Sequence, residues 1–318
     1  MSLAFVFPGQ GSQAVGMGRD LADAFSVARE TFEEVDDALS QRLSRLMFEG
    51  PSDELGLTEN AQPALMAVSL AVFRVLISLG MKPIQQTAQF VAGHSLGEYS
   101  ALAAAGAFTV PVAARLLKRR GQAMQQAVPV GVGAMAAILG ADLDAVLAIA
   151  AEAEANPEGP AEVCQVANDN APGQVVVSGH AGAVERAIKL AAAKGFRRAI
   201  MLPVSAPFHC RLMQPAADIM EQALSEVTIS PLAVPIVSNI TAAPTAIPAE
   251  IRRLLVEQVT GMVRWRESVL AIKAHGIERM VELGAGKVLT GLVKRIDGEI
   301  AGSSVATPSD IETFLKAL

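Results

Sequence analysis

The residues with the most distinctive chemistry are Gly93-His94-Ser95-Leu96-Gly97, a Gly-x-Ser-x-Gly motif. A short apolar run predicts a strand before the motif, and an Ala- and Leu-rich segment predicts a helix after it. A nucleophile elbow requires that order, because its serine sits in a tight strand-to-helix turn. Side chains at positions 93 and 97 would clash in such a turn, and the Leu96 N–H would point toward a developing oxyanion. The motif therefore predicts Ser95 as a nucleophile, with a glycine-lined turn capped by serine as the structural alternative.

A nucleophilic serine needs a base, and the chain has four histidines: His94, His180, His209 and His275. His94 should project away from the Ser95 hydroxyl, His180 opens a predicted helix, and His275 is expected to cap carbonyls at a helix end. His209 lies downstream of the serine in a proline-bounded loop at a helix start, as the serine-first order expects. We therefore predict His209 as the base.

A third group usually orients the imidazole of such a pair. Asp169 is the best acidic candidate, but no acidic residue between Ser95 and His209 stands out. This gap weakens the interpretation of the chain as an ordinary serine hydrolase.

Two further segments could bind anions. The loop 8–13 follows a short apolar strand and can offer backbone N–H groups, although an ordinary turn explains it equally well. A predicted helix from Pro111 to Ala127 carries Lys118, Arg119 and Arg120 in succession. At about 100° per residue these three side chains spread over about 200° of the helix surface. At least one of them must therefore point in a different direction from the others, and a solvated basic face cannot contain all three.

The elements that position these residues alternate between strands and helices, with short loops between them. This order predicts an α/β fold with a mostly parallel sheet covered by helices on both faces. Between residues 133 and 202 the order becomes β-α-β-β-α-β, which is typical of a ferredoxin-like subdomain. We expect residues 1–128 and 204–318 to form the large hydrolase-like catalytic subdomain, and residues 129–203 to form a small inserted one.

Composition narrows the functional classes. The 318 residues are 51% hydrophobic with mean hydropathy +0.37, so a large core is expected, and a net charge of −6 argues against nucleic-acid binding. The longest uncharged run, 121–141, contains glutamines, a proline and several glycines and does not predict a membrane span.

Cys164 and Cys210 form no zinc or disulfide pattern, no secretory signal is recognised, and a cytoplasmic protein is expected. No metal site is expected, and the lack of heptads favours a monomer.

Nearly the whole chain resembles the malonyl-CoA:acyl carrier protein transacylases, the malonyltransferases of fatty acid synthesis. The motifs that carry the resemblance are Phe7-Pro8-Gly9-Gln10-Gly11-Ser12-Gln13, Gly93-His94-Ser95-Leu96-Gly97-Glu98, Arg120-Gly121-Gln122-Ala123-Met124, Val166-Ala167-Asn168, Phe208-His209, Glu257-Gln258 and Gly284-Ala285-Gly286-Lys287-Val288-Leu289.

The resemblance implies roles for individual residues. Ser95 would carry the malonyl group and His209 would be its base, oriented by a backbone carbonyl at Gln258 in place of a carboxylate. The N–H groups of Gln10 and Leu96 would form the oxyanion hole.

It also implies how the substrate is bound. Arg120 would clamp the malonyl carboxylate with its planar fork, and Asn168 would line the same cleft. Phe208 departs from the small residue that often precedes this histidine. It favours malonyl by crowding an α-methyl group, as in the acyltransferase domains of polyketide synthases.

The resemblance thus implies an S-malonyltransferase that moves a malonyl group from malonyl-CoA to acyl carrier protein, without a bound cofactor. We expect the acidic carrier protein to dock on a basic patch around Lys194, Arg197, Arg198 and Arg211. The alternatives are a free-standing acyltransferase of a polyketide synthase, which would use the same chemistry, and a serine thioesterase or hydrolase. A non-catalytic scaffold is the third alternative.

Overall fold

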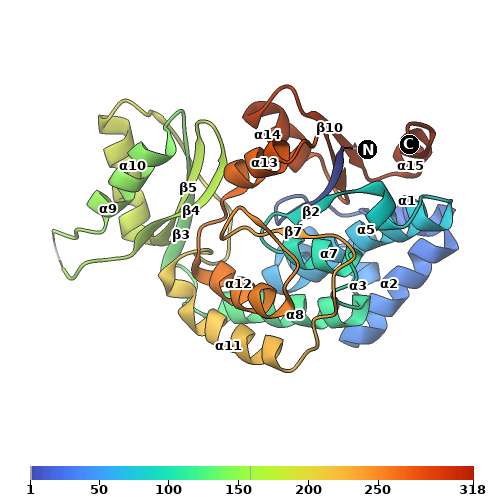
Figure 1. Ribbon diagram of the computed structural model, residues 1–318. Coiled ribbons are helices and arrows are strands. Elements are labelled where there is room, and N and C mark those ends of the chain that lie inside the picture. The colour runs from blue at the N-terminus through green and yellow to red at the C-terminus, as the bar shows by residue number, and fades with distance from the viewer. Residues whose placement is uncertain (1, 158) are drawn as a thin grey trace.

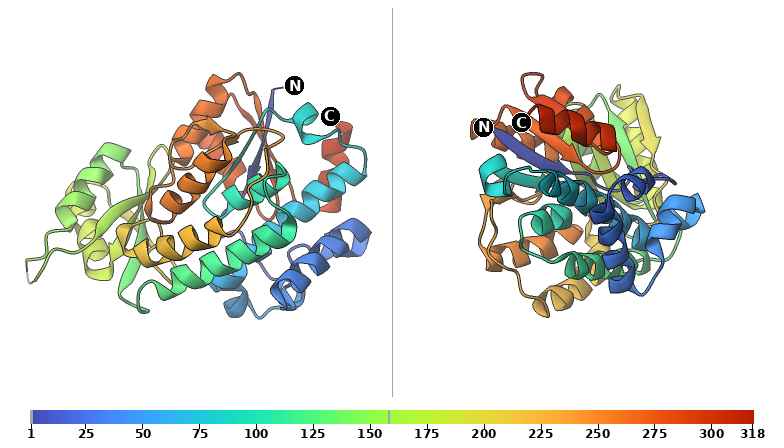
Figure 2. Two further views of the ribbon diagram at one scale, coloured as in Figure 1. Left: turned by 60° about the horizontal axis from the view of Figure 1, so that its bottom comes forward. Right: turned by 90° about the vertical axis from the view of Figure 1, so that its right-hand side faces the viewer.

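The computed structural model describes residues 2–157 and 159–318. Its strands form two separate sheets, one of six strands and one of four (Figure 1). The four-stranded sheet and its two helices lie at one end of the molecule, and both chain termini lie toward the other end (Figure 2).

The six-stranded sheet is mostly parallel. Its strands in spatial order are β10 (Ala301–Val305), β9 (Arg279–Leu283), β1 (Leu3–Phe7), β2 (Phe90–Gly93), β7 (Ile236–Val237) and β8 (Pro244–Thr245). Every neighbouring pair is parallel except β7 and β8. Because β1 and β2 are neighbours in register, Phe7 opposite Gly93, the loops after them leave the same edge of the sheet.

Helices cover both faces of this sheet, as the sequence predicts. Alternate residues of β1 point to opposite faces: Phe5 and Phe7 pack in a cluster with α5 and α8, whereas Ala4 and Val6 pack with α13 and α14. The helices of this part are α1 (Arg19–Ala24), α2 (Ser26–Leu39), α3 (Leu43–Glu49), α4 (Ser52–Gly56), α5 (Thr58–Ser78), α6 (Ile84–Thr87), α7 (Gly97–Ala104), α8 (Val110–Gln126), α11 (Gln214–Ser225), α12 (Pro248–Thr260), α13 (Trp265–Ala274), α14 (Val288–Ile296) and α15 (Pro308–Lys316), with a 3-10 turn η1 (Arg211–Met213).

The smaller sheet is antiparallel. Its elements in chain order are β3 (Gly133–Leu139), α9 (Leu143–Ala153), β4 (Cys164–Ala171), β5 (Gln174–His180), α10 (Ala181–Ala193) and β6 (Arg198–Met201). The strands lie in the order β4-β5-β3-β6, and a separate apolar cluster fills the space between this sheet and its helices. The predicted fold class and the β-α-β-β-α-β order are confirmed, and the predicted limits of the insert, 129–203, stay a prediction.

Backbone hydrogen bonds join the two parts beside the site. Val263, which precedes α13, donates its N–H to Ala167 O at 2.9 Å and accepts from Asp169 N at 3.0 Å. These bonds place Asn168 of β4 against the large part of the molecule. Backbone hydrogen bonds therefore tie the small sheet to the segment between α12 and α13 of the large part.

Breaks in backbone conformation divide the helical segment after β1. Residues 19–49 form three helices, because Phe25 is extended and Ser40 is left-handed. The long helix α5 begins at Thr58, so Pro63 lies inside it.

Candidate active site

Ser95 occupies a strained turn between β2 and α7. Its φ is +53°, a left-handed value that is uncommon for a residue other than glycine. A Cβ at Gly93 would lie 1.9 Å from the carbonyl carbon of Gly97, and a Cβ at Gly97 would lie 2.3 Å from Phe7 O. Both glycines are therefore needed for the turn to close, as the motif predicts.

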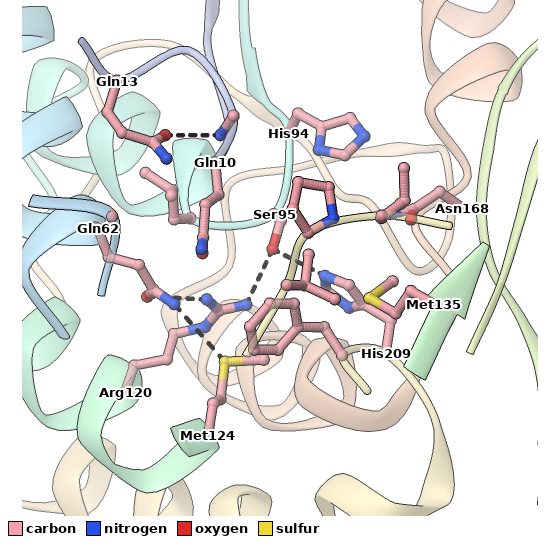
Figure 3. A pocket seen from close by; sticks show the side chains of 17 residues that line it. Gln10, Gln13, Gln62, His94, Ser95, Arg120, Met124, Met135, Asn168 and His209 are labelled. Atoms are coloured by element: carbon pink, nitrogen blue, oxygen red, sulfur yellow. Dashed lines mark hydrogen bonds between the residues drawn. The ribbon is translucent and has the colours of Figure 1, made fainter. Parts of the chain in front are cut away.

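His209 lies opposite the serine. Its Nε2 is 2.8 Å from Ser95 Oγ (Figure 3). Its Nδ1 is 2.8 Å from Gln258 O and 3.2 Å from Gly261 O. Two carbonyls around Nδ1 require a proton there, so Nε2 is left as the acceptor that a base needs. Backbone carbonyls thus orient the imidazole. The suggestion of Asp169 for this task is wrong, since its carboxylate pairs with Arg266 at 2.8 Å.

The electrostatics of the pair favour a neutral imidazole. Burial and the nearby charge of Arg120 lower the pKa of His209 to about 3. His209 is therefore unprotonated at neutral pH and free to accept the Ser95 proton. Its φ of +58° shows a second strained position facing the first.

Arg120 of α8 is buried against the nucleophile. Its Nη2 donates to Ser95 Oγ at 3.0 Å, and its Nη1 donates to Gln62 Oε1 at 2.9 Å (Figure 3). Its Nη2 also donates to Gln258 Oε1 at 2.9 Å. The side chain is 1% exposed, and no residue in the described chain forms an ion pair with it. A buried guanidinium without a carboxylate partner is costly, which points to an anionic ligand as its missing partner.

The neighbours of Arg120 point elsewhere. Lys118 pairs with Glu59 at 3.0 Å, and Arg119 pairs with Glu226 at 3.4 Å. The prediction that the three cations diverge is confirmed, with Arg120 as the one turned inward.

Two residues line the cavity at adjacent strand ends and have backbone N–H groups that are free within the described chain. Gln10 lies in the loop after β1 and Leu96 lies in the turn after β2. Both residues line the cavity beside Ser95, and their backbone N–H groups donate to no protein acceptor within the residues described. Two such donors at one sheet edge can hold an oxyanion.

The cavity in front of Ser95 has a volume of about 410 Å³ and lies between the two sheets. The predicted residues Asn168 and Phe208 both line it, and both are nearly buried. Much of its wall is apolar, formed by Met124, Met135, Leu202, Val204 and Phe208. The structure therefore brings all eight predicted site residues to or beside one cavity.

Three buried polar residues at the site were missed or given no role. Gln62 holds Arg120, and Asn239 accepts from Ser95 N at 2.8 Å and donates to Gly93 O at 2.7 Å. Glu98 follows the elbow and accepts from Asn239 N at 2.7 Å and from the Gln258 amide. The sequence does carry a signal for two of them. Gln62 is the one glutamine of a mostly apolar helix, and Asn239 follows a parallel strand, where site residues collect.

No group of three or more His, Cys, Asp or Glu side chains in the described residues could hold a metal ion. The helix α5 is long and apolar enough to span a membrane by composition, but 78% of its most apolar window is buried inside the protein, as in a core helix.

Comparison with known proteins is consistent over the full length. The model of the acyl transferase domain matches residues 4–306. The malonyl CoA-acyl carrier protein transacylase of Escherichia coli (strain K12) is 46% identical over 313 residues, which cover 98% of each protein.

Solved structures agree. The acyl-carrier-protein-S-malonyltransferase of Bartonella henselae is 53% identical with a TM-score of 0.95, covering 100% of this chain and 99% of that one. A malonyl-transacylase in complex with a type II PKS acyl-carrier protein is 41% identical, also with a TM-score of 0.95, and covers 100% of both chains.

Proposed function

The chain belongs to the acyl transferase domain family, and we propose that it moves a malonyl group from malonyl-CoA to the phosphopantetheine thiol of acyl carrier protein. The observation that carries this proposal is Arg120, a buried cation without a carboxylate partner in the described chain that donates to the Ser95 hydroxyl. A serine thioesterase for uncharged acyl groups would gain nothing from a charge in that position. A malonyl group supplies the missing carboxylate one methylene away from the reacting thioester carbonyl.

The first half-reaction acylates the enzyme. The malonyl carboxylate binds the Arg120 guanidinium. It accepts hydrogen bonds from guanidinium N–H groups that, in the free protein, donate to Ser95 and its neighbours. Burial is the larger cause of the lowered pKa of His209 and the Arg120 charge adds to it, so this pairing offsets the second of the two contributions. Ser95 Oγ gives its proton to His209 Nε2 and bonds to the thioester carbon.

The tetrahedral oxyanion then accepts from the N–H groups of Gln10 and Leu96. As it collapses, the carbon–sulfur bond breaks and His209 returns the proton to the CoA sulfur. The products of this half-reaction are malonyl-Ser95 and free CoA. In the second half-reaction the phosphopantetheine thiol attacks malonyl-Ser95 by the reverse path, which makes the scheme ping-pong.

Two lining residues tune the fit. Phe208 narrows the pocket beside the α-carbon of the acyl group and disfavours an α-methyl substituent. Asn168 lines the same space from the small sheet. Malonyl-CoA is a substrate, and the chemistry above uses no bound cofactor.

We further propose that the protein works as a monomer in the cytoplasm. The two cysteines, Cys164 and Cys210, are free and buried, which suits a reducing compartment.

Intact mass spectrometry tests the function directly. Mixing the protein with malonyl-CoA is expected to add one malonyl group, mapped to Ser95, and adding holo carrier protein is expected to remove it to the carrier. Ser95→Ala is the matched control and should remain unmodified. Decay of the adduct to free malonate without transfer would favour a hydrolase instead, and no adduct on folded protein would contradict the proposal.

The partner of one relative favours a second candidate. Because that malonyl-transacylase is bound to a type II PKS carrier protein, the present chain could load a polyketide synthase by the same chemistry. Transfer rates to carrier proteins of fatty acid and polyketide synthesis, measured side by side, separate the two.

A further inference from the structure

Glu98 is a buried acid that the mechanism above does not use. It lies in the first turn of α7, three residues after Ser95, and is 2% exposed. Its Oε1 accepts from Asn239 N at 2.7 Å, and its Oε2 accepts from the side-chain amide of Gln258. Both carboxylate oxygens are therefore acceptors, and the acid faces the interior next to the site.

The Gln258 amide connects Glu98 to Arg120. Gln258 Nε2 donates to Glu98 and to Ser95 O at 2.9 Å, while its Oε1 accepts from Arg120 Nη2 at 2.9 Å. An amide has two distinct ends, and two acceptors on one side force its nitrogen to that side. The oxygen is then turned toward the guanidinium.

We infer that Glu98 is a positioning residue which, through Gln258, fixes the Arg120 guanidinium in the acyl pocket and so sets the preference for an acyl group with a carboxylate. The inference rests on the proposed function. It assigns selectivity to an acid separated from Arg120 by one side chain, and it explains why a buried acid stands beside the elbow without contacting the imidazole.

The opposite orientation of the amide shows why an acceptor is needed. If Gln258 were turned over, its NH₂ would face the donors of Arg120 and its oxygen would face Ser95 O. Arg120 would lose one of its three acceptors, and a guanidinium held by fewer bonds has no fixed position from which to bind a carboxylate bidentately.

Glu98→Gln tests this with little change in shape. The new Oε1 still accepts from Asn239 N, so the support of the elbow is kept. The new NH₂ faces the Gln258 NH₂, and the two donors cannot both be satisfied. A purely structural role would lower the reaction with every acyl group equally, whereas a role in positioning Arg120 lowers the reaction with malonyl selectively.

The measurement is the rate of acyl-Ser95 formation from malonyl-CoA and from acetyl-CoA. It is made at pH 8, because burial raises the pKa of Glu98 to about 7 against the opposing effect of its donors and Arg120. The wild-type ratio of the malonyl to the acetyl rate is expected to fall at least tenfold in Glu98→Gln. Gln258→Met, which removes the connecting amide, should lower the ratio similarly, and the double variant should fall no further.

A second background and a control variant sharpen the test. In Arg120→Ala the ratio is already low, and adding Glu98→Gln should leave it unchanged because no guanidinium remains to be positioned. Glu282→Gln is the matched control: Glu282 is fully buried and accepts from Leu289 N at 3.1 Å and Thr290 N at 2.8 Å. It does not line the cavity, so it should lower the melting temperature without moving the ratio.

The outcomes separate the inference from the proposed function. A wild-type protein that does not prefer malonyl-CoA overturns both. A wild-type preference that survives in Glu98→Gln, or in Gln258→Met if the first variant does not fold, overturns the role of Glu98 alone. An equal loss of both rates in Glu98→Gln also overturns it, because that result assigns Glu98 to the elbow.

Discussion

The wall of the cavity that comes from the large sheet holds its side chains with buried hydrogen bonds, whereas the wall from the small sheet meets the cavity mainly with apolar groups. On the first wall Ser95 and His209 both have left-handed backbone angles, and Asn239 and Gln258 pin the turn between them. On the second wall Met135 is flexible and apolar.

This difference separates chemistry from fit. Strained positions persist when the surroundings over-determine them, and the first wall supplies that support from several distant segments. An apolar wall instead accepts changes of volume at modest cost. Changes to the residues that hold Ser95 and His209 should therefore remove rate, whereas changes at Arg120, in the apolar lining or at the rim should alter which acyl group or carrier is accepted.

The largest expected effect is at the nucleophile. Ser95→Ala leaves the oxyanion hole and Arg120 in place but removes the atom that bonds to the acyl group, so turnover should fall by roughly 10⁴-fold or more. Steady-state transfer to carrier protein and the intact mass of the variant measure this. Transfer above a tenth of the wild-type rate would show that the strained turn is not where the chemistry occurs.

The next largest effect is expected at Arg120, and it concerns the preference for malonyl over acetyl. Arg120→Ala leaves a bound malonyl carboxylate buried without a partner, which should cost about 2–5 kcal/mol for malonyl relative to acetyl. The relative acylation rates from the two CoA esters measure it. If both rates fall by the same factor, Arg120 supports the turn rather than the carboxylate.

A smaller effect is expected from the lining. Phe208→Ala opens the pocket next to the α-carbon and should weaken discrimination against methylmalonyl-CoA by about 1–3 kcal/mol, the range for one methyl group. The ratio of kcat/KM for the two esters measures it, and the malonyl value itself should change less than the ratio. An unchanged ratio would remove Phe208 from the specificity pocket.

The sequence was most informative where chemistry depends on local order. The elbow and the divergence of Arg120 from its neighbours follow from spacing of a few residues, and His209 stands out by its proline-bounded loop downstream of the serine. The alternation of strands and helices likewise predicts both sheets. Each of these depends on a turn or a helical period, which a short window of sequence contains.

The remainder depends on segments that meet only after folding. Gln62 and Asn239 are 58 and 144 residues from their partners Arg120 and Ser95. The orientation of His209 by the Gln258 carbonyl has no side-chain signature, because every residue has a carbonyl, and only the resemblance implied it. Glu98 is the last residue of the motif that begins at Gly93, yet its contact with Gln258 leaves no pattern along the chain.

The smallest expected effect concerns the rim formed by the small sheet, where the carrier protein is expected to dock. Of the four predicted cations, Lys194 pairs with Glu152 at 3.1 Å and Arg211 pairs with Glu154 at 2.9 Å. Arg197 is exposed, as is Arg198 at the start of β6, and neither forms an ion pair within the described residues. These two cations are therefore free to meet an acidic partner.

From Arg198, β6 runs toward Leu202 at the cavity, about 13 Å along the strand at ~3.3 Å per residue. Arg198→Glu should therefore slow transfer to carrier protein by about fivefold at low salt, with a smaller effect at high salt, because rim charges act mainly on association. Acylation by malonyl-CoA alone should change less than twofold. Lys316→Glu makes the same change of charge on α15, at the far end of the molecule (Figure 1), and should leave both steps unaltered. If the two variants slow transfer equally, the carrier protein responds to net charge, and the small sheet contributes fit to the acyl group without contributing a docking surface.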